Sequence, residues 1–375
     1  MHMSWKEKLE RVAEPSFPDK TDWNIASVGS GDIVEKCHQA AYRKVGFHTE
    51  AIFSRKREKA QRVADHYEIP KVYTDWEKML EDPAIDIVDI ALPPHMQLEV
   101  VRKCCRENDH IRGILCQKPA AMCAKDAVEI GRLCREAGIT VAVNHNMRFD
   151  QSIRALKYTL EEGLLGKPVL ATIEMRARSE WQRFYEQYGM LEIFNMGIHH
   201  IDTIRHLFGD PEKITAVYSR NPQVDFPHND GFSQYNLIYP EGFFASVLDD
   251  DFAGPKEETG CAQDIYIKWR VEGTDGQAQG TIGWPFFPER IPSMFRITSK
   301  KIGRGWVTPM WETTWFPDAF AGTMADLLIA VENGAQPSIR PEDSAKTLAC
   351  VEACYRSAKE ERTIYLKETD PLQQL

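Results

Sequence analysis

Two side chains suited to proton-transfer chemistry stand at the ends or on the faces of predicted elements. The first is Lys118, in Cys116–Gln117–Lys118–Pro119, at the end of the predicted strand Ile111–Cys116. A lysine at the end of a buried strand can hydrogen-bond a hydroxyl group and stabilise negative charge that develops on its oxygen. Pro119 stiffens the turn, which favours a Lys118 side chain that projects from the strand end. The alternative is an ordinary loop lysine in solvent.

The second candidate is His199, in a segment with a helical pattern, 191–209. Asn195, His199, Asp202 and His206 are spaced by four, three and four residues and form one polar stripe on a helix. Histidine is the side chain best suited to proton transfer near neutral pH. The alternative is a stripe that faces solvent. It fits His206 best, because a cation near a helix C-terminus is favourable.

The sequence does not favour a metal site. His199, His200 and Asp202 are the nearest candidates for ligands. Adjacent histidines on a helix point about 100° apart, and no further ligand is evident in the pattern. The nine cysteines show no C-x-x-C spacing, which favours buried thiols over a zinc or disulfide framework. We therefore expect no metal.

A glycine turn precedes both candidates in the chain. Gly29–Ser30–Gly31 follows the apolar residues of 25–28 and leads into a predicted helix. It is two thirds of the dinucleotide fingerprint G-x-G-x-x-G, in which glycines permit a tight turn and a close backbone approach to phosphate. Val34 stands at the third position, which mainly controls how closely helix and strand pack. Taken alone, the turn fits an ordinary loop equally well.

Strand and helix patterns alternate from residue 23 to residue 145. After the first strand, at 25–28, further strands are predicted at 49–54, 85–91, 111–116 and 140–143. Helices are predicted at 32–45, 56–67, 95–106 and 123–137. This alternation predicts a parallel sheet with right-handed connections. Ligands bind at the carboxyl ends of such strands, so the turns at 29–33, 54–56, 91–95 and 116–119 should line one edge.

The residues after the second strand bear on cofactor choice. A site for NAD places Asp or Glu there to bind the ribose 2′-hydroxyl. This chain has Ser54–Arg55–Lys56–Arg57 instead, and a guanidinium with a hydroxyl suits a 2′-phosphate. The sequence therefore predicts NADP, with NAD less favoured. The alternative is a solvated basic helix start.

The second half of the chain has a different pattern. Strands are predicted at 169–178, 213–219, 232–239, 243–249, 264–272 and 277–283, and closing helices at 318–333 and 341–360. We could not assign 284–317. The expected fold class is α/β: an N-terminal Rossmann dinucleotide-binding domain plus a C-terminal α+β domain with an open-faced, mostly antiparallel sheet. The predicted domains are an N-terminal extension (1–22), the Rossmann domain (23–145) and a substrate-binding and oligomerisation domain with the closing helices (146–375).

Composition limits the class of partner. The 375 residues carry a net charge of −10, with 43% hydrophobic and 27% charged residues. The net negative charge of this globular chain repels nucleic acid and anionic membranes, so we expect neither as its main partner. No apolar run approaches the ~18 residues of a membrane span, and residues 1–22 lack a signal-peptide core. We expect a cytoplasmic protein.

The chain resembles the Gfo/Idh/MocA family of sugar and polyol oxidoreductases from about residue 23 to residue 365. The matching pieces are Gly29–Ser30–Gly31, Pro93 after the third strand, Gln117–Lys118–Pro119 for the family's Glu-Lys-Pro, Asn146–Met147–Arg148–Phe149–Asp150 at the domain junction, Gly197–Ile198–His199–His200–Ile201–Asp202 for G-x-H-x-x-D, and Glu272–Gly273–Thr274–Asp275–Gly276. Each piece is weak alone, but their order and separations are specific.

The resemblance implies an oxidoreductase, often oligomeric through its open sheet, here expected to be a homodimer or homotetramer. It places the catalytic lysine at Lys118 and the catalytic histidine at His199, and we add Asn195 and Asp202 to the catalytic set. The predicted cofactor-binding residues are Gly29, Ser30, Gly31, Asp32, Ile33, Ser54, Arg55, Leu92, Pro93, Gln97, Gln117, Lys118, Asn146 and Arg148. The predicted substrate-binding residues are Lys118, Arg148, Arg176, Arg183, Asn195, His199 and His200.

Three departures from the family pattern keep alternatives open. Asn195 stands where many members have aspartate four residues before the histidine, which places the acid of a proton relay in doubt or moves it to Asp202. Gln117 replaces glutamate, and Val34 replaces a small residue.

The preferred function is hydride transfer between NADP and a hydroxyl or keto carbon of a carbohydrate-like substrate: a sugar, a polyol or a sugar acid. Arg148 and Arg183, with the alternating strand Thr172–Glu174–Arg176–Arg178, could bind the carboxylate of a sugar acid. The alternatives are a redox-neutral isomerase or lyase with tightly bound cofactor, and a non-catalytic dinucleotide-binding regulator.

Overall fold

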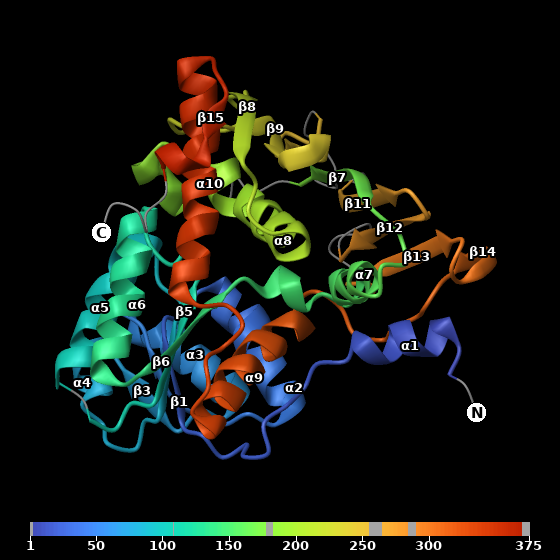
Figure 1. Ribbon diagram of the computed structural model, residues 1–375. Helices are drawn as coiled ribbons and strands as arrows, with labels where there is room; N and C mark the ends of the chain where they lie inside the picture. The colour runs from blue at the N-terminus through green and yellow to red at the C-terminus, as the bar shows by residue number, and fades with distance from the viewer. Residues whose placement is uncertain (1–2, 108, 178–182, 255–264, 284–289, 370–375) are drawn as a thin grey trace. The chain divides into compact units, whose positions relative to one another are not determined.

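The computed structural model describes residues 3–107, 109–177, 183–254, 265–283 and 290–369 (Figure 1). The chain divides into two compact units. The Rossmann unit comprises Pro15–Asn146 and Phe316–Lys346. The sheet unit comprises Met1–Glu14, Met147–Trp315 and Thr347–Gln374.

The Rossmann unit is built on a six-stranded parallel sheet in the order β3-β2-β1-β4-β5-β6. Its strands are β1 (Ile25–Val28), β2 (Thr49–Phe53), β3 (Lys71–Tyr73), β4 (Ile87–Ile90), β5 (Gly113–Gln117) and β6 (Thr140–Asn144). This is the doubly wound order in which a dinucleotide binds where the strand order reverses, beside the carboxyl ends of β1 and β4. The predicted parallel sheet is confirmed.

Helices connect these strands. They are η1 (Val34–His38), a π-helix that continues into α2 (Gln39–Val45), then α3 (Arg57–Tyr67), α4 (Trp76–Leu80), α5 (Pro94–Glu107) and α6 (Ala124–Ala137). The later helix α9 (Asp318–Asn333) completes the unit, because Phe320, Met324 and Leu327 pack in one buried cluster with Ile25 and Leu115 of the sheet. The sheet therefore buries apolar side chains against a helix that comes from the end of the chain.

The sheet unit contains a nine-stranded sheet in the order β14-β13-β12-β11-β7-β10-β9-β8-β15. The strands are β7 (Pro168–Arg176), β8 (Lys213–Ser219), β9 (Phe232–Ile238), β10 (Phe244–Asp250), β11 (Tyr266–Gly273), β12 (Gly276–Ile282), β13 (Met294–Ser299), β14 (Gly303–Val307) and β15 (Ile364–Tyr365). All neighbouring pairs are antiparallel except β7 and β10. This agrees with the expected mostly antiparallel domain, and β13 and β14 lie in the stretch that we could not assign.

Residues alternate between the two faces of this sheet. Along β10, Ala245, Val247 and Asp249 are buried, whereas Phe244 and Leu248 are exposed. We refer to the face that carries Phe244 and Leu248 as the outer face. Helix α7 (Gln151–Glu161) packs against β12 and β13. The other helices that lie wholly within the unit are α1 (Trp5–Val12), η3 (Arg183–Tyr188), η4 (Ile193–Gly197), α8 (Ile198–Phe208), η5 (Pro240–Gly242) and η6 (Leu366–Glu368), whereas η2 (Asn146–Phe149) and α10 (Pro341–Glu360) begin in the Rossmann unit and continue into this one.

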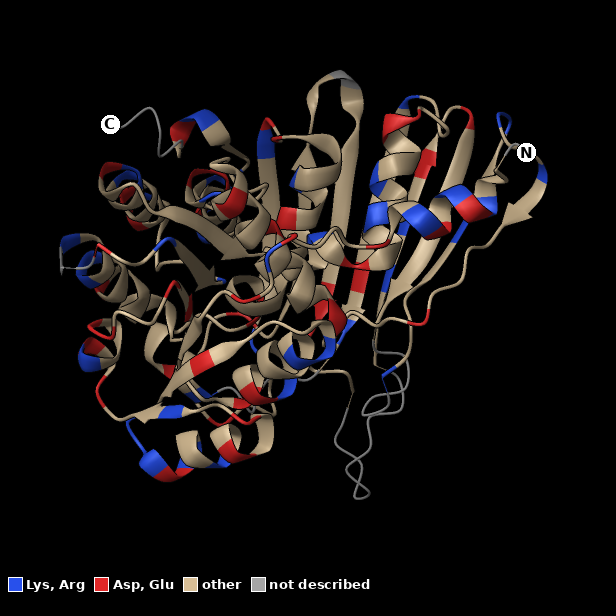
Figure 2. Ribbon diagram, turned by 90° about the horizontal axis from the view of Figure 1, so that it is seen from below, with Lys and Arg blue, Asp and Glu red and all other residues tan. Residues whose placement is uncertain are grey.

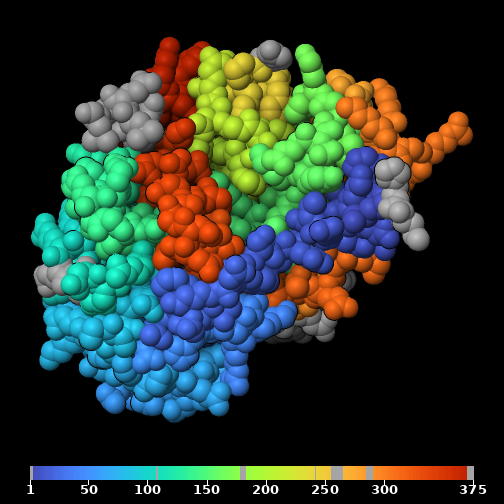
Figure 3. All heavy atoms as spheres, turned by 60° about the horizontal axis from the view of Figure 1, so that its bottom comes forward, coloured from blue at the N-terminus to red at the C-terminus, as the bar shows by residue number. Residues whose placement is uncertain are grey.

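The first helix belongs to the sheet unit. Leu9 of α1 is fully buried, and the guanidinium of Arg154 on α7 donates hydrogen bonds to the carbonyls of Val12 (3.2 Å) and Glu14 (2.6 Å). Basic and acidic residues alternate along α1 in Figure 2, and Figure 3 shows the dark blue atoms of the chain start beside green and orange atoms. Helix α1, in the predicted N-terminal extension, thus packs onto α7.

The units differ from the predicted domains at two places, and the Rossmann unit contains two elements that were not predicted. The segment 1–14 joins the sheet unit, the segment 316–346 with α9 joins the Rossmann unit, and β3 and α4 are additional elements. Pattern reasoning assigned α9 to the second domain because it follows that domain's strands in the chain. Within the described part of the chain, no helix is both long and apolar enough to span a membrane.

Candidate active site

The glycine turn is shaped by contact with the neighbouring strand. Gly29 has a φ of 136°, and a Cβ at this position would lie 2.5 Å from the carbonyl oxygen of Ala91 after β4. A Cβ at Gly31 would meet no heavy atom within 4 Å. Gly29 is therefore required by the fold, whereas Gly31 leaves open space for a ligand beside the backbone.

The helix after the turn begins directly over this space. The N–H groups of Val34 and Glu35 donate to the carbonyl of Gly31 at 2.9 and 3.0 Å. Val34 is fully buried and packs with Ile52 and Val63, so a core side chain fills the third position of the fingerprint. A helix N-terminus over an open glycine turn is suited to binding phosphate.

Other predicted cofactor residues flank the turn. Ser30 is buried, whereas Asp32 is exposed and ion-pairs with Lys36 at 3.6 Å. After β2, Ser54 accepts a hydrogen bond from the Lys56 N–H at 3.3 Å, and Arg55 is exposed beside it. Strand β2 thus ends in a hydroxyl and a guanidinium, with no carboxylate before Glu58.

Lys118 follows β5 in a backbone segment that is held on both sides. The amide nitrogen of Gln97, on α5, donates to the carbonyls of Gln117 (2.9 Å) and Pro119 (2.8 Å). The N–H of Lys118 donates to Oε1 of Gln117 at 2.7 Å. Gln97 was predicted to bind cofactor, but it is fully buried and its nitrogen is committed to this backbone, so we correct its role to a structural one. Leu92 and Pro93, between β4 and α5, are half-buried.

The environment of Lys118 changes its acidity. Burial disfavours the charged ammonium and lowers the pKa of Lys118 from 10.5 to about 7. A lysine near this pKa exists in both protonation states at neutral pH, which is typical of groups that take part in proton transfer.

In the sheet unit, Arg148 and Asp202 form a buried ion pair. Arg148 Nε and Nη2 donate to the two carboxylate oxygens of Asp202 at 2.7 and 2.6 Å, and the hydroxyl of Thr347 donates to Asp202 at 3.0 Å. This corrects two predictions. Because Asp202 neutralises the charge of Arg148, Arg148 is not suited to bind the carboxylate of a substrate. Asp202 in turn binds this arginine and does not supply the acid of a proton relay. Asn146, in the same η2 segment as Arg148, is buried.

His199 and Asn195 lie one helical turn apart where η4 passes into α8. Both are buried, and the ring of His199 packs edge-on against Trp315 with centroids 5.7 Å apart. The hydroxyl of Tyr185, on η3, donates to Oδ1 of Asn195 at 2.9 Å. Tyr185 was missed by sequence reasoning, and no signal in the sequence distinguishes it from other aromatic residues of that segment.

His200 points away from this pair. It is fully buried, and its Nδ1 lies 2.8 Å from Oδ1 of Asp249 on the buried face of β10. Asp249 also accepts a hydrogen bond from Tyr235 at 2.8 Å. We correct His200 from a substrate-binding residue to part of the packing between α8 and the sheet. Within the described residues, no group of three or more metal-ligating side chains is present.

The predicted arginines lie in two environments. Arg176 ion-pairs with Asp250 at 3.2 Å on the outer face, opposite the face that carries Asp249 and α8. It therefore cannot join His199 in one site, which corrects that prediction. Arg183 lies on η3, two residues from Tyr185, and pairs with the exposed Asp225 at 2.9 Å. Arg178 falls outside the described residues.

Comparison with known proteins gives the family. Residues 23–145 match a model described as oxidoreductase family, NAD-binding Rossmann fold, and residues 157–366 match the model of the same family's C-terminal alpha/beta domain. The chain belongs to the Gfo/Idh/MocA oxidoreductase family. The predicted resemblance and fold class are confirmed, and the protein is an NAD(P)-dependent oxidoreductase.

Two relatives and one solved structure show what this Gfo/Idh/MocA protein is similar to. It is similar to D-apiose dehydrogenase of Paraburkholderia graminis, 26% identical over 361 residues that cover 92% of this chain and 90% of the relative. It is similar to an NADP-dependent scyllo-inositol 2-dehydrogenase of Bacillus subtilis, at 23% identity covering 81% of this chain and 90% of the relative. A solved oxidoreductase of Agrobacterium radiobacter, in complex with NAD+, L-tartaric acid and magnesium, has the same fold at 24% identity, covering 93% of this chain and 99% of that chain with a TM-score of 0.77.

Proposed function

We propose that the protein is an NADP-dependent dehydrogenase that acts on a CH–OH group of a sugar, polyol or sugar acid. The observation that carries this proposal is Lys118, held at the carboxyl end of β5 with its pKa lowered to about 7. The names of the relatives support the substrate class, since they are dehydrogenases of D-apiose and scyllo-inositol.

The residues around the glycine turn fit a dinucleotide. Gly31 leaves space that a side chain would otherwise fill, and the helix N-terminus beside it favours a pyrophosphate. Gly29, Ser30 and Gly31 would hold the pyrophosphate, and Ser54 with Arg55 would hold the 2′-phosphate. When bound, the nicotinamide supplies the acceptor for a hydride.

Each protein side chain has a defined part in the proposed reaction. Lys118 hydrogen-bonds the hydroxyl oxygen of the substrate and stabilises the negative charge that grows there. His199 removes the hydroxyl proton as the general base. Asn195, fixed by Tyr185, binds a second substrate hydroxyl through its amide group. Asparagine cannot take a proton, so Asn195 does not share the base function of His199 in this proposal.

The residues at the end of β2 support a preference for NADP. Arg55 can donate two hydrogen bonds to a phosphate. Positions 54 and 55 carry no Asp or Glu, so no carboxylate there would repel a 2′-phosphate. An NADP-dependent relative supports this assignment.

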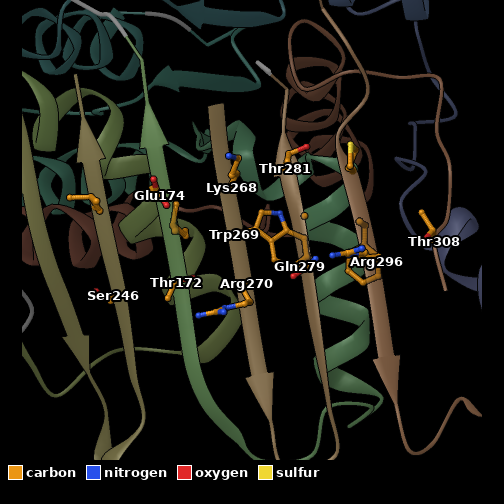
Figure 4. Close-up of a pocket in the computed structure, with 15 residues that line it drawn as sticks. Thr172, Glu174, Ser246, Lys268, Trp269, Arg270, Gln279, Thr281, Arg296 and Thr308 are labelled. Carbon is orange, nitrogen blue, oxygen red and sulfur yellow. The ribbon is translucent and has the colours of Figure 1, made fainter. Parts of the chain in front are cut away.

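We also propose a homodimer or homotetramer through the outer face of the nine-stranded sheet. Phe244, Leu248 and Met294 are exposed there, and Leu248 and Met294 line a hollow of about 740 Å³. Figure 4 shows Lys268, Arg270, Arg296 and Glu174 on neighbouring strands of the same face. An apolar surface with both signs of charge can pair with a copy of itself. Leu248→Arg should convert the oligomer to monomer in sedimentation velocity, and an unchanged mass would contradict this interface.

The test of function is a spectroscopic screen. Purified protein is mixed with NADP+ or NAD+ and D-apiose, D-xylose, scyllo-inositol, gluconate or glucuronate, and reduced nicotinamide is followed by absorbance. We expect turnover with NADP+ that is lost in Lys118→Ala. Substrate conversion without net NADPH would instead indicate the redox-neutral reaction. Tight NADPH binding without any conversion would indicate a regulator and make Asn195 the residue to explain.

A further inference from the structure

A buried chain of hydrogen bonds connects His38 to the backbone of Lys118 inside the Rossmann unit. His38, on η1, is fully buried, with Nδ1 2.7 Å from Oδ2 of Asp89 on β4. Its Nε2 lies 3.0 Å from the amide nitrogen of Gln117 on β5. The oxygen of the same amide accepts the N–H of Lys118 at 2.7 Å. The residues of this hydrogen-bond chain come from three elements, η1, β4 and β5, which meet next to Lys118.

The hydrogen-bond partners fix where each proton lies. A backbone N–H can only donate, so the Gln117 side chain must turn its oxygen to Lys118 and its NH2 group to His38. An NH2 group can only donate, so Nε2 of His38 accepts and carries no proton. The imidazole proton is therefore on Nδ1 and is donated to Asp89. His38 is held as a neutral ring in one tautomer.

Neighbouring polar groups agree with this assignment. The amide nitrogen of Asn144, on β6, faces the same Nε2 at 3.4 Å. The hydroxyl of Tyr42 donates to Oδ2 of Asp89 at 3.0 Å. Asp89 therefore accepts from two donors on one side of the ring, while amide groups donate to the other side.

We propose that His38 is a positioning residue that fixes the Gln117 amide and thereby the position of Lys118. The inference rests on the proposed role of Lys118 at the reacting hydroxyl. Gln97 binds the carbonyls of the residues on either side of Lys118, and the Gln117 side chain binds the Lys118 N–H. Because His38 holds the Gln117 amide, it fixes the second of these two sets of hydrogen bonds. Gln117 is matched to this ring, because the glutamate of the family motif could not donate to an unprotonated Nε2.

The first experiment reads the environment of Lys118 without any substrate. Trinitrobenzenesulfonate labels neutral amines, and the pH midpoint of labelling at each lysine is measured by peptide mass spectrometry. His38→Gln keeps an oxygen that can accept near the place of Nε2, whereas His38→Leu removes the acceptor. Lys59, exposed on α3, is the internal control.

The expected result separates the two variants. His38→Gln should keep the wild-type midpoint at Lys118. In His38→Leu the released lysine reaches water, so its midpoint should rise by about one pH unit or more toward that of an ordinary lysine. A folded His38→Leu protein with the wild-type midpoint would overturn the proposal.

A second measurement needs no destabilised variant. In histidine ¹⁵N NMR of the wild-type protein, the signals absent from His38→Gln belong to His38. We expect a protonated Nδ1 and an unprotonated Nε2 at pH 7, and Gln117→Glu should bring a proton onto Nε2. The opposite tautomer in the wild type, or an imidazolium, overturns the inference.

The two proposals fail separately. Turnover of the sugar panel by Lys118→Ala would refute the role of Lys118 and leave the labelling and NMR results as they stand. With both proposals correct, His38→Leu should lower kcat by about a hundredfold, the cost of misplacing a reacting group by roughly 1 Å. NADPH binding, followed by fluorescence, should stay within about twofold of wild type, and His38→Gln should restore most of the rate.

Discussion

Arg148 and Asp202 form a bidentate ion pair in which two guanidinium nitrogens lie 2.7 and 2.6 Å from the two carboxylate oxygens. The two residues are 54 positions apart, and both belong to motifs by which the chain resembles its family. The pair ties the η2 segment at the start of the sheet unit to helix α8, which carries His199. Its role is therefore to fix the helix that positions the proposed base.

Breaking this pair should destabilise the protein. Asp202→Asn leaves the buried Arg148 without a counter-charge, so we expect a loss of about 3 kcal/mol in the free energy of unfolding. Asp225→Asn removes one of the two carboxylates that pair with the exposed Arg183 and should cost less than about 0.5 kcal/mol. Urea denaturation measures both, and equal losses in the two variants would contradict the structural role of the pair.

The two glycines of the turn should respond differently to the same substitution. Gly29→Ala places a Cβ against the Ala91 carbonyl at a φ of 136°, and it should lower the unfolding free energy by about 2 kcal/mol or more. Gly31→Ala meets no atom of the protein and should change stability by less than about 0.5 kcal/mol. Its effect should appear in NADPH affinity, measured by fluorescence titration. Normal affinity in Gly31→Ala would contradict a pyrophosphate at this turn.

Cofactor preference should reverse with the charge at Arg55. Arg55→Asp replaces a phosphate donor with a repelling carboxylate, so the ratio of kcat/KM for NADP+ over NAD+ should fall by about 100-fold. Lys59→Asp makes the same charge change further along α3 and should alter the ratio by less than about threefold, because exposed charges at a distance are screened. These ratios follow from initial rates with each cofactor. If both variants change the ratio equally, the effect is long-range and Arg55 does not contact the 2′-phosphate.

The lowered pKa of Lys118 should be visible in stability as well as in catalysis. Between pH 7 and pH 10.5 the unfolded lysine is protonated while the folded one is largely neutral. The unfolded state then binds more protons, so the stability that Lys118 contributes rises with pH across this window. Lys118→Met should flatten that rise in urea titrations between pH 7 and pH 10. If the stability of the variant rises with pH as steeply as that of the wild type, the pKa of Lys118 in the folded protein is that of an ordinary lysine.

Local patterns predicted most of the elements that carry the site. The glycine turn, the strand before Lys118 and the helix with His199 are each encoded within about 20 residues, and all three are present. The short strand β3 was missed because its three half-buried residues give no periodicity. Strand β13 alternates buried Phe295 and Ile297 with exposed neighbours, but the surrounding proline and aromatic residues hid that pattern.

The sequence did not predict which polar residues pair with one another. His38 lies 51 residues from Asp89 and 79 from Gln117, and Arg148 lies 54 from Asp202. A polar residue on a helix face is as compatible with solvent as with a buried partner until the sheet order is known. For the same reason Arg176 and His200 looked equivalent to site residues, although one lies on the outer face and the other packs on Asp249.

The chain passes between the two units after Glu14, Asn146, Trp315 and Lys346, so neither unit is a continuous stretch of sequence. The Rossmann sheet lacks the covering helix α9 until residue 333 has been synthesised, and the sheet unit lacks its last strand until residue 365. On a ribosome, the apolar residues that α9 covers would stay exposed to water for most of translation. A fragment ending at residue 145 would carry the glycine turn and Lys118 and still expose that surface, which makes it a poor candidate for expression as an independent domain.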